Sequence, residues 1–518
     1  MNAVAAVPAA AVTVATVAPP VAVEANAAAL AAFAGYLVLI VALGVVSARF
    51  SSAGISEFFV GGRRMNRFVV ALSAVVSGRS AWLLLGVTGL AYTRGASAVW
   101  AVAGYVVVEA ALFLYYGRRL RRFAGARDCV TVPDFFAERF GDRRGDRGAA
   151  VLRVALAAVI LVFMVAYVAA QFVAGGKAFA ASFGVAPTTG VVATAAIVLA
   201  YTVLGGFLAV SLTDLVQASF MIAALVLLPA VAIVQRGGLA AVLGELSALD
   251  ATLVDPAAIG FGAALGFVAI GLGSPGSPHI LARYMSIGDA EELRTAAVVG
   301  TVWNVVMGWG ALFIGLAGRA WFPEVASLPG ADAESLYPAL AGHLLHPVLF
   351  GVVVASIFAA IMSTADSQLL VAASSLVRDV YEKLVAGGRE VPQRRLVLFS
   401  RLTVVALVAA SLWLGLGAES LVFWLVLFAW AGLGAALGPT SILALYWRRT
   451  TRAGVLAGVV AGTVVTVGWE LAGWPLYELI PGFAAGVVAT VGVSLVTRRP
   501  AGVEGMFAVM EGRGDGVR

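Results

Sequence analysis

The sequence predicts an all-α membrane protein that crosses the bilayer many times. Of its 518 residues, 61% are hydrophobic and 12% are charged, and the mean hydropathy is +0.98. A water-soluble fold could not bury so much apolar surface. Apolar windows of about 20 residues, the length of a bilayer-spanning helix, occur about thirteen times along the chain. We therefore expect a polytopic bundle of about thirteen transmembrane helices.

Short loops separate the predicted spans and leave no room for a soluble domain. The spans lie at residues 29–49, 68–92, 97–117, 150–181, 188–209, 213–235, 258–282, 293–320, 341–377, 399–416, 420–446, 453–472 and 476–496. Residues 1–28 are rich in Ala, Val and Pro and lack the basic region of a secretory signal, so we expect a disordered, uncleaved leader. Residues 498–518 are Gly-rich and polar and are expected to form a disordered cytoplasmic tail. The transmembrane domain then covers 29–497.

The arginines mark one side of the membrane. They gather in the loops after the first, third, ninth, eleventh and thirteenth predicted spans, and the intervening loops carry mainly Asp and Glu. By the positive-inside rule, this places the N-terminus outside and the C-terminus in the cytoplasm of a multi-pass plasma (inner) membrane protein. The formal charge of +6 and the pI near 9.6 follow from this topology and do not indicate nucleic-acid binding.

Redox chemistry is not indicated by the residues that usually support it. Cys129 is the single cysteine, which excludes an intrachain disulfide. Three histidines are too few for haem or iron–sulfur chemistry. We predict no bound cofactor and no obligate protein partner.

Two predicted spans carry a polar cluster near their middle. Residues 77–80 read Ser-Gly-Arg-Ser, and residues 363–367 read Ser-Thr-Ala-Asp-Ser. Hydrocarbon satisfies neither polar groups nor free backbone, so such clusters face a protein interior or a watery cavity. Both clusters mark a candidate transport site.

The second span is expected to unwind at its cluster. Gly78 loosens the backbone and the neighbouring serines offer it competing hydrogen bonds, so an unwound turn would expose carbonyl groups to a cation. The alternative is a close packing contact between helices. Arg79 favours a functional role, because a membrane-buried arginine costs roughly 2.5–3.5 kcal/mol to insert.

The ninth span presents a stripe of oxygen ligands. Four residues share one helix face because they are spaced i, i+3, i+4 and i+7, namely Ala360, Ser363, Thr364 and Ser367. Hydroxyl oxygens suit a hard cation such as Na⁺. The alternative is that the hydroxyls bond carbonyl groups of their own helix or a neighbouring helix. Asp366, within the same cluster, favours the cation site.

A second break is expected in the seventh span, where residues 271–279 read GLGSPGSPH. Proline removes a backbone donor and kinks a helix, so this span must be discontinuous. Two broken helices in one bundle are typical of a midplane substrate site in a secondary transporter. Asp214 begins the sixth span, where helix capping is the alternative to a functional role. Glu109 and Glu470 have no evident partner, and the sequence assigns them no role.

Together these motifs closely resemble the sodium/solute symporter family, and within it the sodium/proline symporters. The similarity runs over roughly residues 57–497. It includes, in order, FFVGGRRM (58–65), ALSAVVSGRSAWLLLG (71–86), GGFLAVSLTDLVQAS (205–219), SPHILARYM (277–285), AAIMSTADSQLLVAASSLVRDVY (359–381), WAGLGAALGP (430–439) and LYELIPGF (476–483).

The resemblance implies a five-plus-five inverted-repeat (LeuT-like) core formed by spans two to eleven, with one helix before it and two after. It implies that Na⁺ is the coupling ion and that its site falls on the carbonyl groups of Val76, Arg79 and Ala360 and the hydroxyls of Ser363 and Thr364. A second cation site is implied at Asp214, Asp366 and Ser367. The implied substrate-facing positions are Ser80, Trp82, Tyr167, Ile270, Ser274 and Pro278. Ile270 and Ser274 replace the aromatic residues of a proline-binding wall.

The chain departs from the proline symporters at the first polar cluster. Those proteins place an aspartate where this chain has Gly78 and a neutral residue where it has Arg79. The difference of about two charges would weaken Na⁺ binding unless Arg79 points away or is paired. We hypothesise that Arg79 pairs with Asp366 or Asp214, or that it holds the carboxylate of the substrate.

We expect a secondary active transporter that couples the entry of a cation, Na⁺, to the uptake of proline or a related amino acid. Its partners are then the small-molecule substrate, Na⁺ and the lipid bilayer. The alternative transporter is a proton-coupled or sodium-independent carrier in which Arg79 replaces the cation and Asp214 or Asp366 titrates. A sensor would need an output domain. An enzyme would need a convergent catalytic set, whereas the histidines lie far from the serine clusters in sequence.

Overall fold

The computed structural model describes residues 26–48, 54–141, 146–203, 206–387, 389–418 and 421–513. These residues form helices and connecting segments, with no β-strand among them. The helices are α1 (Ala27–Ala48), α2 (Ile55–Val60), α3 (Arg67–Ala81), α4 (Thr88–Arg94), α5 (Val99–Ala111), α6 (Gly117–Ala126), α7 (Val132–Arg139), α8 (Arg147–Phe183), α9 (Pro187–Thr202), α10 (Phe207–Gln235), α11 (Leu239–Leu249), α12 (Phe261–Ala269), α13 (Pro278–Ser286), α14 (Leu293–Trp321), α15 (Leu336–Leu344), α16 (Pro347–Ser374), α17 (Gln393–Leu416), α18 (Val422–Tyr446), α19 (Arg452–Leu471), α20 (Leu479–Val496) and α21 (Val503–Glu511).

Each predicted span coincides with helical structure. By length and composition, 10 helical segments within the described residues could cross a membrane. One of them, Arg67–Ala126, contains two of the predicted spans, and α9 and the broken segment Phe261–Gly276 are shorter than a usual span. The count of thirteen crossings therefore stays a prediction.

One predicted boundary is wrong. The expected spans 188–209 and 213–235 correspond to α9, which ends at Thr202, and α10, which already begins at Phe207. Gly206 has extended backbone angles at the start of α10. Glycine is a poor helix former, so this glycine was a signal for an earlier boundary.

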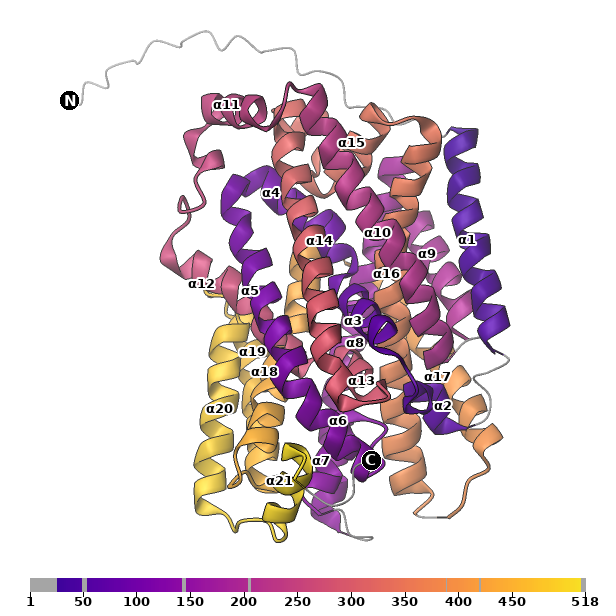
Figure 1. The fold of residues 1–518 in the computed structure, drawn as a ribbon, viewed down its shortest axis with the longest axis vertical. Helices are drawn as coiled ribbons and strands as arrows, with labels where there is room; N and C mark the ends of the chain where they lie inside the picture. Colours follow the sequence, from indigo (N-terminus) through magenta and orange to yellow (C-terminus); the bar gives the residue numbers. More distant parts are fainter. Residues whose placement is uncertain are drawn as a thin grey trace, which may run out of the picture.

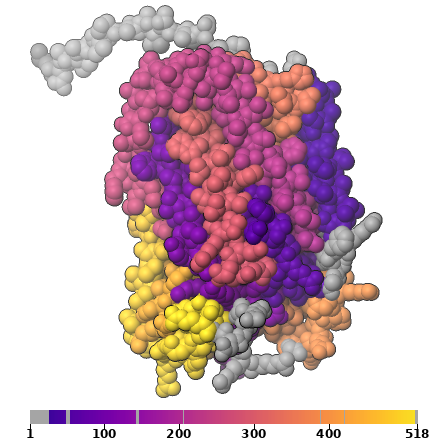
Figure 2. Space-filling model, in the orientation of Figure 1, coloured from indigo at the N-terminus to yellow at the C-terminus, as the bar shows by residue number. Residues whose placement is uncertain are grey.

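The helices form an elongated bundle with its most buried members in the middle (Figure 1). In α16 and α18, 83% of the most apolar window is buried, against 28% in α1 and α20. In Figure 1, α1 lies at one edge of the bundle and α20 at the other. Figure 2 shows the same face filled in, with α14 lying between α5 and α10, which it contacts. A buried α16 and α18 are thus placed to line a site within the protein, while α1 and α20 have faces left for lipid.

Both predicted breaks are confirmed by the backbone. In α3, Ser80 has a φ of 45° and a ψ of −175°, so the helix is interrupted there. A π-helical segment, Trp82–Val87, then leads into α4. The seventh span divides into α12, a 3₁₀ segment Ile270–Gly276, and α13, which starts at Pro278 after the extended Ser277. The positive φ at Ser80 is uncommon for a residue other than glycine and marks a locally constrained turn.

The expectation of a disordered C-terminal tail is wrong for part of it, because this segment contains a helix. Residues Val503–Glu511 form α21, which packs on α6 with Val503, Phe507 and Met510 buried. Those three residues are spaced i, i+4 and i+7, which is a helical pattern that the Gly-rich composition obscured. The predicted leader lies outside the described residues as far as residue 25, and α1 begins at Ala27.

Candidate functional site

The predicted cation site brings together atoms of α3 and α16. The Ser363 hydroxyl lies 3.4 Å from the Val76 carbonyl oxygen and 3.2 Å from the Ala360 carbonyl oxygen. The Thr364 hydroxyl lies 3.1 Å from the Ser77 carbonyl oxygen. Both hydroxyls thus donate to carbonyl oxygens, as the alternative to a cation site expects. The same carbonyl and hydroxyl oxygens are of the kind that a hard cation such as Na⁺ binds, so the cation site stays a prediction.

The Arg79 carbonyl, also predicted as a Na⁺ ligand, does not bond to α16. It accepts a hydrogen bond from the backbone N–H of Trp82, just past the break at Ser80. Of the predicted ligands, Val76, Ala360, Ser363 and Thr364 therefore meet between α3 and α16, whereas the Arg79 carbonyl is engaged within its own chain segment.

The residues of the predicted second cation site also converge. Asp214 of α10 accepts a 2.5 Å hydrogen bond from the Ser73 hydroxyl. Ser367 of α16 donates to the Asp366 carboxylate at 3.0 Å, and its hydroxyl lies 3.1 Å from that of Ser77. All of these side chains are buried. The helix-capping alternative for Asp214 is wrong, because α10 begins at Phe207 and Asp214 lies well inside it.

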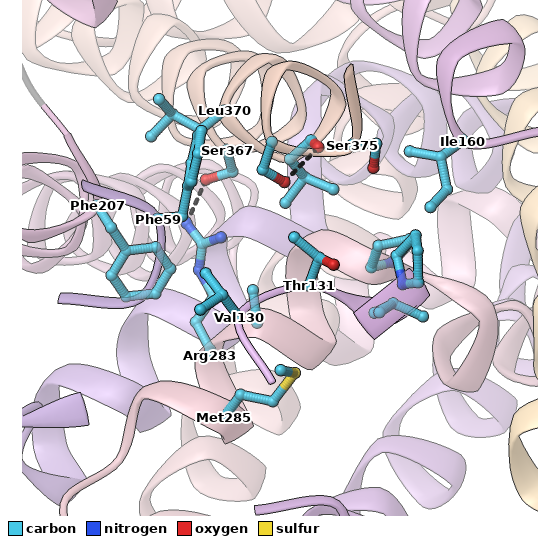
Figure 3. A pocket seen from close by; sticks show the side chains of 16 residues that line it. Phe59, Val130, Thr131, Ile160, Phe207, Arg283, Met285, Ser367, Leu370 and Ser375 are labelled. Atoms are coloured by element: carbon cyan, nitrogen blue, oxygen red, sulfur yellow. Dashed lines mark hydrogen bonds between the residues drawn. The ribbon is translucent and has the colours of Figure 1, made fainter. Parts of the chain in front are cut away.

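Arg283 of α13 joins the two halves of this second site. Its guanidinium lies 3.4 Å from the Asp214 carboxylate and donates to the Ser73 hydroxyl at 3.1 Å. It also donates to the Ser367 hydroxyl, as Figure 3 shows, and to the His279 carbonyl at 2.8 Å. We call Arg283, Ser73, Asp214, Asp366 and Ser367 the Arg283 network.

Asp366 has a further partner in α9. The Tyr201 hydroxyl lies 2.7 Å from one Asp366 carboxylate oxygen and 2.8 Å from the Met362 carbonyl oxygen. Tyr201 is itself buried, at 2% exposure. The Arg283 network is therefore held by five elements of the bundle, α3, α9, α10, α13 and α16.

The expected pairing of Arg79 with Asp366 or Asp214 is wrong. The Arg79 guanidinium instead forms a 2.8 Å ion pair with Glu109 of α5 and donates to the Asn304 side-chain oxygen of α14 at 2.8 Å. Both charged side chains are buried, with 4% and 0% exposed. Helix α5 supplies the carboxylate because its Tyr105 hydroxyl donates to the Gly78 carbonyl of α3, which places Glu109, one turn further along α5, beside the break.

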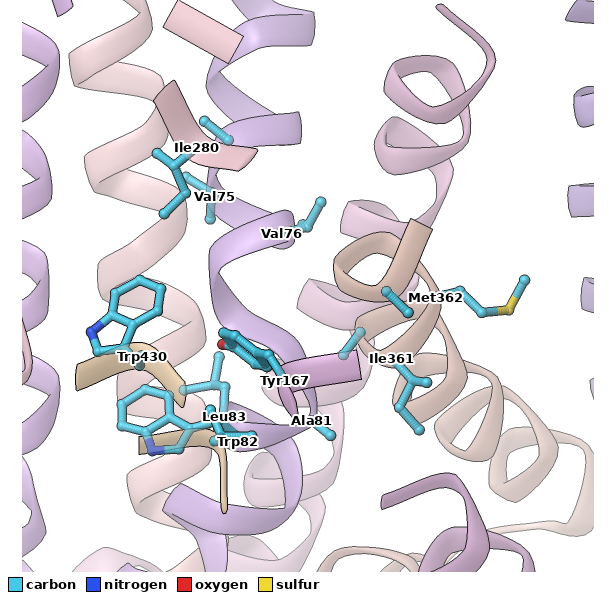
Figure 4. Packing of buried hydrophobic residues seen from close by; sticks show 14 of the residues in the cluster. Val75, Val76, Ala81, Trp82, Leu83, Tyr167, Ile280, Ile361, Met362 and Trp430 are labelled. Carbon is cyan, nitrogen blue, oxygen red and sulfur yellow. The ribbon is translucent and has the colours of Figure 1, made fainter. Parts of the chain in front are cut away.

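An aromatic cavity lies on the other side of the α3 break. Trp82 stacks on Tyr105 at 6.2 Å between ring centroids, and Tyr105 stacks on Trp430 at 5.8 Å. The Tyr167 hydroxyl lies 3.4 Å from that of Ser80. In Figure 4, Trp82 and Trp430 lie together on one side of the break, with Ile361 and Met362 of α16 on the other.

The cavity contains some of the predicted substrate positions but not others. It measures about 10 Å³ and is lined by Gly78, Trp82, Tyr105, Tyr167, Ile270, Val426, Leu427 and Trp430. Trp430 lines the cavity next to Ile270, and its indole N–H donates to the Ile270 carbonyl at 2.8 Å. Of the predicted substrate positions, Ser80, Ser274 and Pro278 do not line this cavity. Pro278 lines a second cavity of about 20 Å³, which also touches Arg283 and Ser367 (Figure 3).

Sequence reasoning missed several residues of these networks, chiefly Glu109, Arg283 and Asn304. A buried arginine needs a carboxylate partner, and Glu109 was one of the few acidic residues within the predicted spans. Arg283 was visible as the charge within SPHILARYM beside the predicted break. Asn304 carried no comparable signal, because one amide in an apolar helix is compatible with many packing roles.

Comparison with known families and curated proteins gives one consistent result. Residues 58–462 match the model of the sodium:solute symporter family. The osmoregulated proline transporter OpuE of Bacillus subtilis (strain 168) is 36% identical over 467 residues, covering 88% of this chain and 93% of that protein. The high-affinity proline transporter PutP of the same strain is 37% identical, covering 87% and 94%. The sodium/proline symporter of Staphylococcus aureus (strain JH9) is 35% identical, covering 90% and 92%.

Solved structures agree on the fold. A Na⁺-coupled sialic acid symporter, solved in a substrate-bound outward-open state, has a TM-score of 0.77 at 17% identity, covering 92% of this chain and 99% of that chain. Mhp1, a nucleobase-cation-symport-1 family transporter, has a TM-score of 0.54 at 12% identity, covering 89% and 98%. The predicted all-α, five-plus-five inverted-repeat class is thereby confirmed. This chain belongs to the sodium:solute symporter family, and it is a multi-pass membrane transporter rather than an enzyme.

Proposed function

We propose that the protein imports proline together with Na⁺ across the cell membrane. The observation that carries this proposal is the convergence of the Val76 and Ala360 carbonyls with the Ser363 and Thr364 side chains, next to an aromatic cavity. The names of the three curated relatives support proline as the substrate, at 35–37% identity over most of each chain.

Na⁺ acts by favouring one conformation of the broken helix. Its ligands come from α3 and α16, so binding holds these helices together at the break. A ligand shifts a conformational equilibrium only through its different affinity for the two states. Na⁺ therefore stabilises the state in which the α3 turn is correctly placed for substrate, and proline must raise the affinity for Na⁺ by the same factor.

Proline fits the chemistry of the neighbouring cavity. The aromatic faces of Trp82 and Trp430 suit its apolar ring, and the Tyr167 hydroxyl, which lies 3.4 Å from that of Ser80, can meet its polar groups. The cavity of about 10 Å³ has room for about one water molecule, so proline requires the aromatic side chains to separate. Transport then requires the aromatic side chains that line the cavity to separate and to close again.

The sodium-independent alternative is not favoured. Arg79 would have to place its charge where the cation binds, but its guanidinium is engaged by Glu109 and Asn304 on α5 and α14. The oxygens from Val76 and Ser363 lie between α3 and α16 instead. The Arg79 guanidinium therefore does not occupy the proposed Na⁺ site between α3 and α16.

Uptake by the purified protein tests this function. Proteoliposomes would be assayed for radiolabelled proline uptake under an inward Na⁺ gradient and under a choline gradient, each at two pH values. We expect uptake driven by the Na⁺ gradient and competition by unlabelled proline above other amino acids. Uptake that is equal in choline, or that follows a proton gradient alone, would contradict the proposal.

The orientation and chain organisation belong to the same proposal. Residues 29–497 form the symporter domain, preceded by the leader 1–28 and followed by the cytoplasmic tail 498–518. The alternating arginine-rich loops support an external N-terminus and a cytoplasmic C-terminus. In a Cys129→Ser background, an impermeant maleimide should label Ala472→Cys from outside intact cells and Ala501→Cys only after permeabilisation. The reverse labelling would contradict this orientation.

A further inference from the structure

The environment of Arg79 is one that recognises a cation. Its guanidinium donates from Nη2 to Glu109 and from Nε to Asn304, at 2.8 Å each. Its carbon atom Cζ lies 3.1 Å from the centre of the Tyr105 ring. A carboxylate, an amide oxygen and an aromatic face each attract positive charge, and here they come from two different helices, α5 and α14.

These cation-binding groups are fixed independently of Arg79. The Asn304 amide nitrogen donates to Glu109, and the Tyr105 hydroxyl lies 3.4 Å from the other Glu109 oxygen. The same hydroxyl donates to the Gly78 carbonyl at 3.2 Å. The Glu109 side chain is fully buried. Without Arg79, a carboxylate would remain inside the bundle with only neutral donors, a costly arrangement that a cation would relieve.

Gly78 shapes the space that Glu109 uses. A Cβ atom at this position would collide with the Tyr105 hydroxyl and would lie 3.7 Å from the nearer Glu109 oxygen. The carboxylate of α5 thus sits beside the backbone of the α3 break, where a side chain from position 78 has no room. The negative charge at the break is supplied from α5, and Arg79 neutralises it from α3.

We propose that Glu109, the Asn304 side-chain oxygen and the Tyr105 ring form a further monovalent-cation site, which Arg79 fills as a tethered cation. Arg79 takes the place of one mobile Na⁺, so the protein carries one Na⁺ fewer per cycle than its acidic sites could hold. Removal of the guanidinium opens the site to Na⁺. The transport readout of this inference rests on the proposed Na⁺–proline function, but Na⁺ binding by the purified protein does not.

Direct Na⁺ binding provides the first test. Equilibrium binding of ²²Na⁺ to the purified protein would be compared for the parent, Arg79→Ala, Arg79→Lys and the double variant Arg79→Ala/Glu109→Gln. We expect about one additional Na⁺ per protein in Arg79→Ala, because the Glu109 charge is then unbalanced. The double variant and Arg79→Lys should bind the parental number. An unchanged count in Arg79→Ala, or an additional Na⁺ that persists in the double variant, would overturn the proposal.

Transport stoichiometry provides the second test. In proteoliposomes, the ratio of ²²Na⁺ to proline should rise by about one in Arg79→Ala and return to the parental value in the double variant. A matched control is Arg67→Ala, since Arg67 and Glu292 form an exposed pair between the ends of α3 and α14. This control should keep the parental ratio. A proton carried in place of the additional Na⁺ would overturn the proposed ligand.

A substitution of Glu109 tests the same pair if the Arg79→Ala variant fails to fold. Glu109→Gln retains the side-chain shape and leaves the Arg79 charge unbalanced near the cation ligands of α3. We expect the Na⁺ concentration for half-maximal binding to rise about tenfold. An unchanged value would overturn the charge-balancing role. A parent protein that lacks Na⁺-driven proline uptake, but whose Arg79→Ala variant binds an additional Na⁺, would refute the proposed function and leave this inference standing.

Discussion

The two buried arginines at the broken spans differ in their charge balance. Arg79 on α3 faces one carboxylate, that of Glu109. Arg283 on α13 contacts Asp214 and, through the Ser367 hydroxyl, is linked to Asp366 as well. The first network is neutral by formal charge, whereas the second has one carboxylate in excess. A surplus of buried negative charge favours a mobile cation, as the proposed second cation site at Asp214, Asp366 and Ser367 requires.

The hydrogen bonding of the carboxylate oxygens also differs between the two networks. Both Glu109 oxygens are contacted by donors, from Arg79, Asn304 and Tyr105. In the Arg283 network, one oxygen of the buried Asp214 carboxylate has no hydrogen-bond partner within the described part of the chain. A cavity of about 20 Å³, enough for one water molecule, also reaches Arg283. The Arg79 network therefore leaves no carboxylate oxygen unpaired, whereas the Arg283 network retains one.

Breaking the Arg79–Glu109 ion pair should have the largest effect, a loss of stability. Arg79→Met leaves Glu109 unpaired, so we expect the free energy of unfolding in Na⁺-free detergent to fall by about 3–5 kcal/mol. Replacing both partners, as in Arg79→Met/Glu109→Leu, should recover most of this loss because no buried charge remains. Denaturant unfolding of the purified variants measures both values. A double variant as unstable as the single one would show that Arg79 acts through packing rather than charge.

Removing the surplus carboxylate should have the next largest effect. Asp366→Asn keeps an acceptor for the Tyr201 hydroxyl but makes the Arg283 network neutral. We expect the Na⁺ concentration for half-maximal proline uptake to rise about 100-fold, because one full negative charge near the ion is lost. This exceeds the effect expected of Glu109→Gln. A larger effect of Glu109→Gln would reverse the comparison between the two networks.

The sequence predicted the bundle and the breaks because both follow from local chemistry. Apolar stretches predicted the spans, and the glycines and prolines of residues 271–279 predicted the discontinuous seventh span. The stripe on α16 also emerged from spacing alone, since Ser363 and Thr364 share a face with Ala360. These features depend on neighbours within one helix.

The ion pairing could not be predicted in the same way. Arg79 and Glu109 lie 30 residues apart on different helices, and several acidic residues were available as partners. Which of them meets Arg79 depends on helix rotation and packing, and hydropathy does not encode that choice. Ile270 and Pro278 line different cavities for a related reason, because a broken span can turn its two halves in different directions.

Gly78 links the neutral network to the substrate cavity, and its substitution should have an intermediate effect. A methyl group in Gly78→Ala would push the Tyr105 hydroxyl away from the backbone. Since Tyr105 lines the aromatic cavity, we expect a stability loss of about 1–3 kcal/mol and a higher KM for proline. The variant Gly78→Ala/Tyr105→Phe, which removes the hydroxyl, should lose less than the sum of the two single changes. Denaturant unfolding and uptake kinetics measure these effects, and simple additivity would contradict the contact.

The smallest effect on stability is expected at an exposed ion pair at the start of α3. Arg67, at the start of α3, lies 3.6 Å from Glu292, which immediately precedes α14, and their side chains are 44% and 36% exposed. Water already solvates both charges, so Arg67→Ala should change the free energy of unfolding by about 0.5 kcal/mol or less. The contrast with Arg79→Met isolates burial as the cause, because both arginines connect α3 to an acidic partner. A loss of several kcal/mol in Arg67→Ala would mean that helix tethering, rather than burial of charge, gives Arg79 its importance.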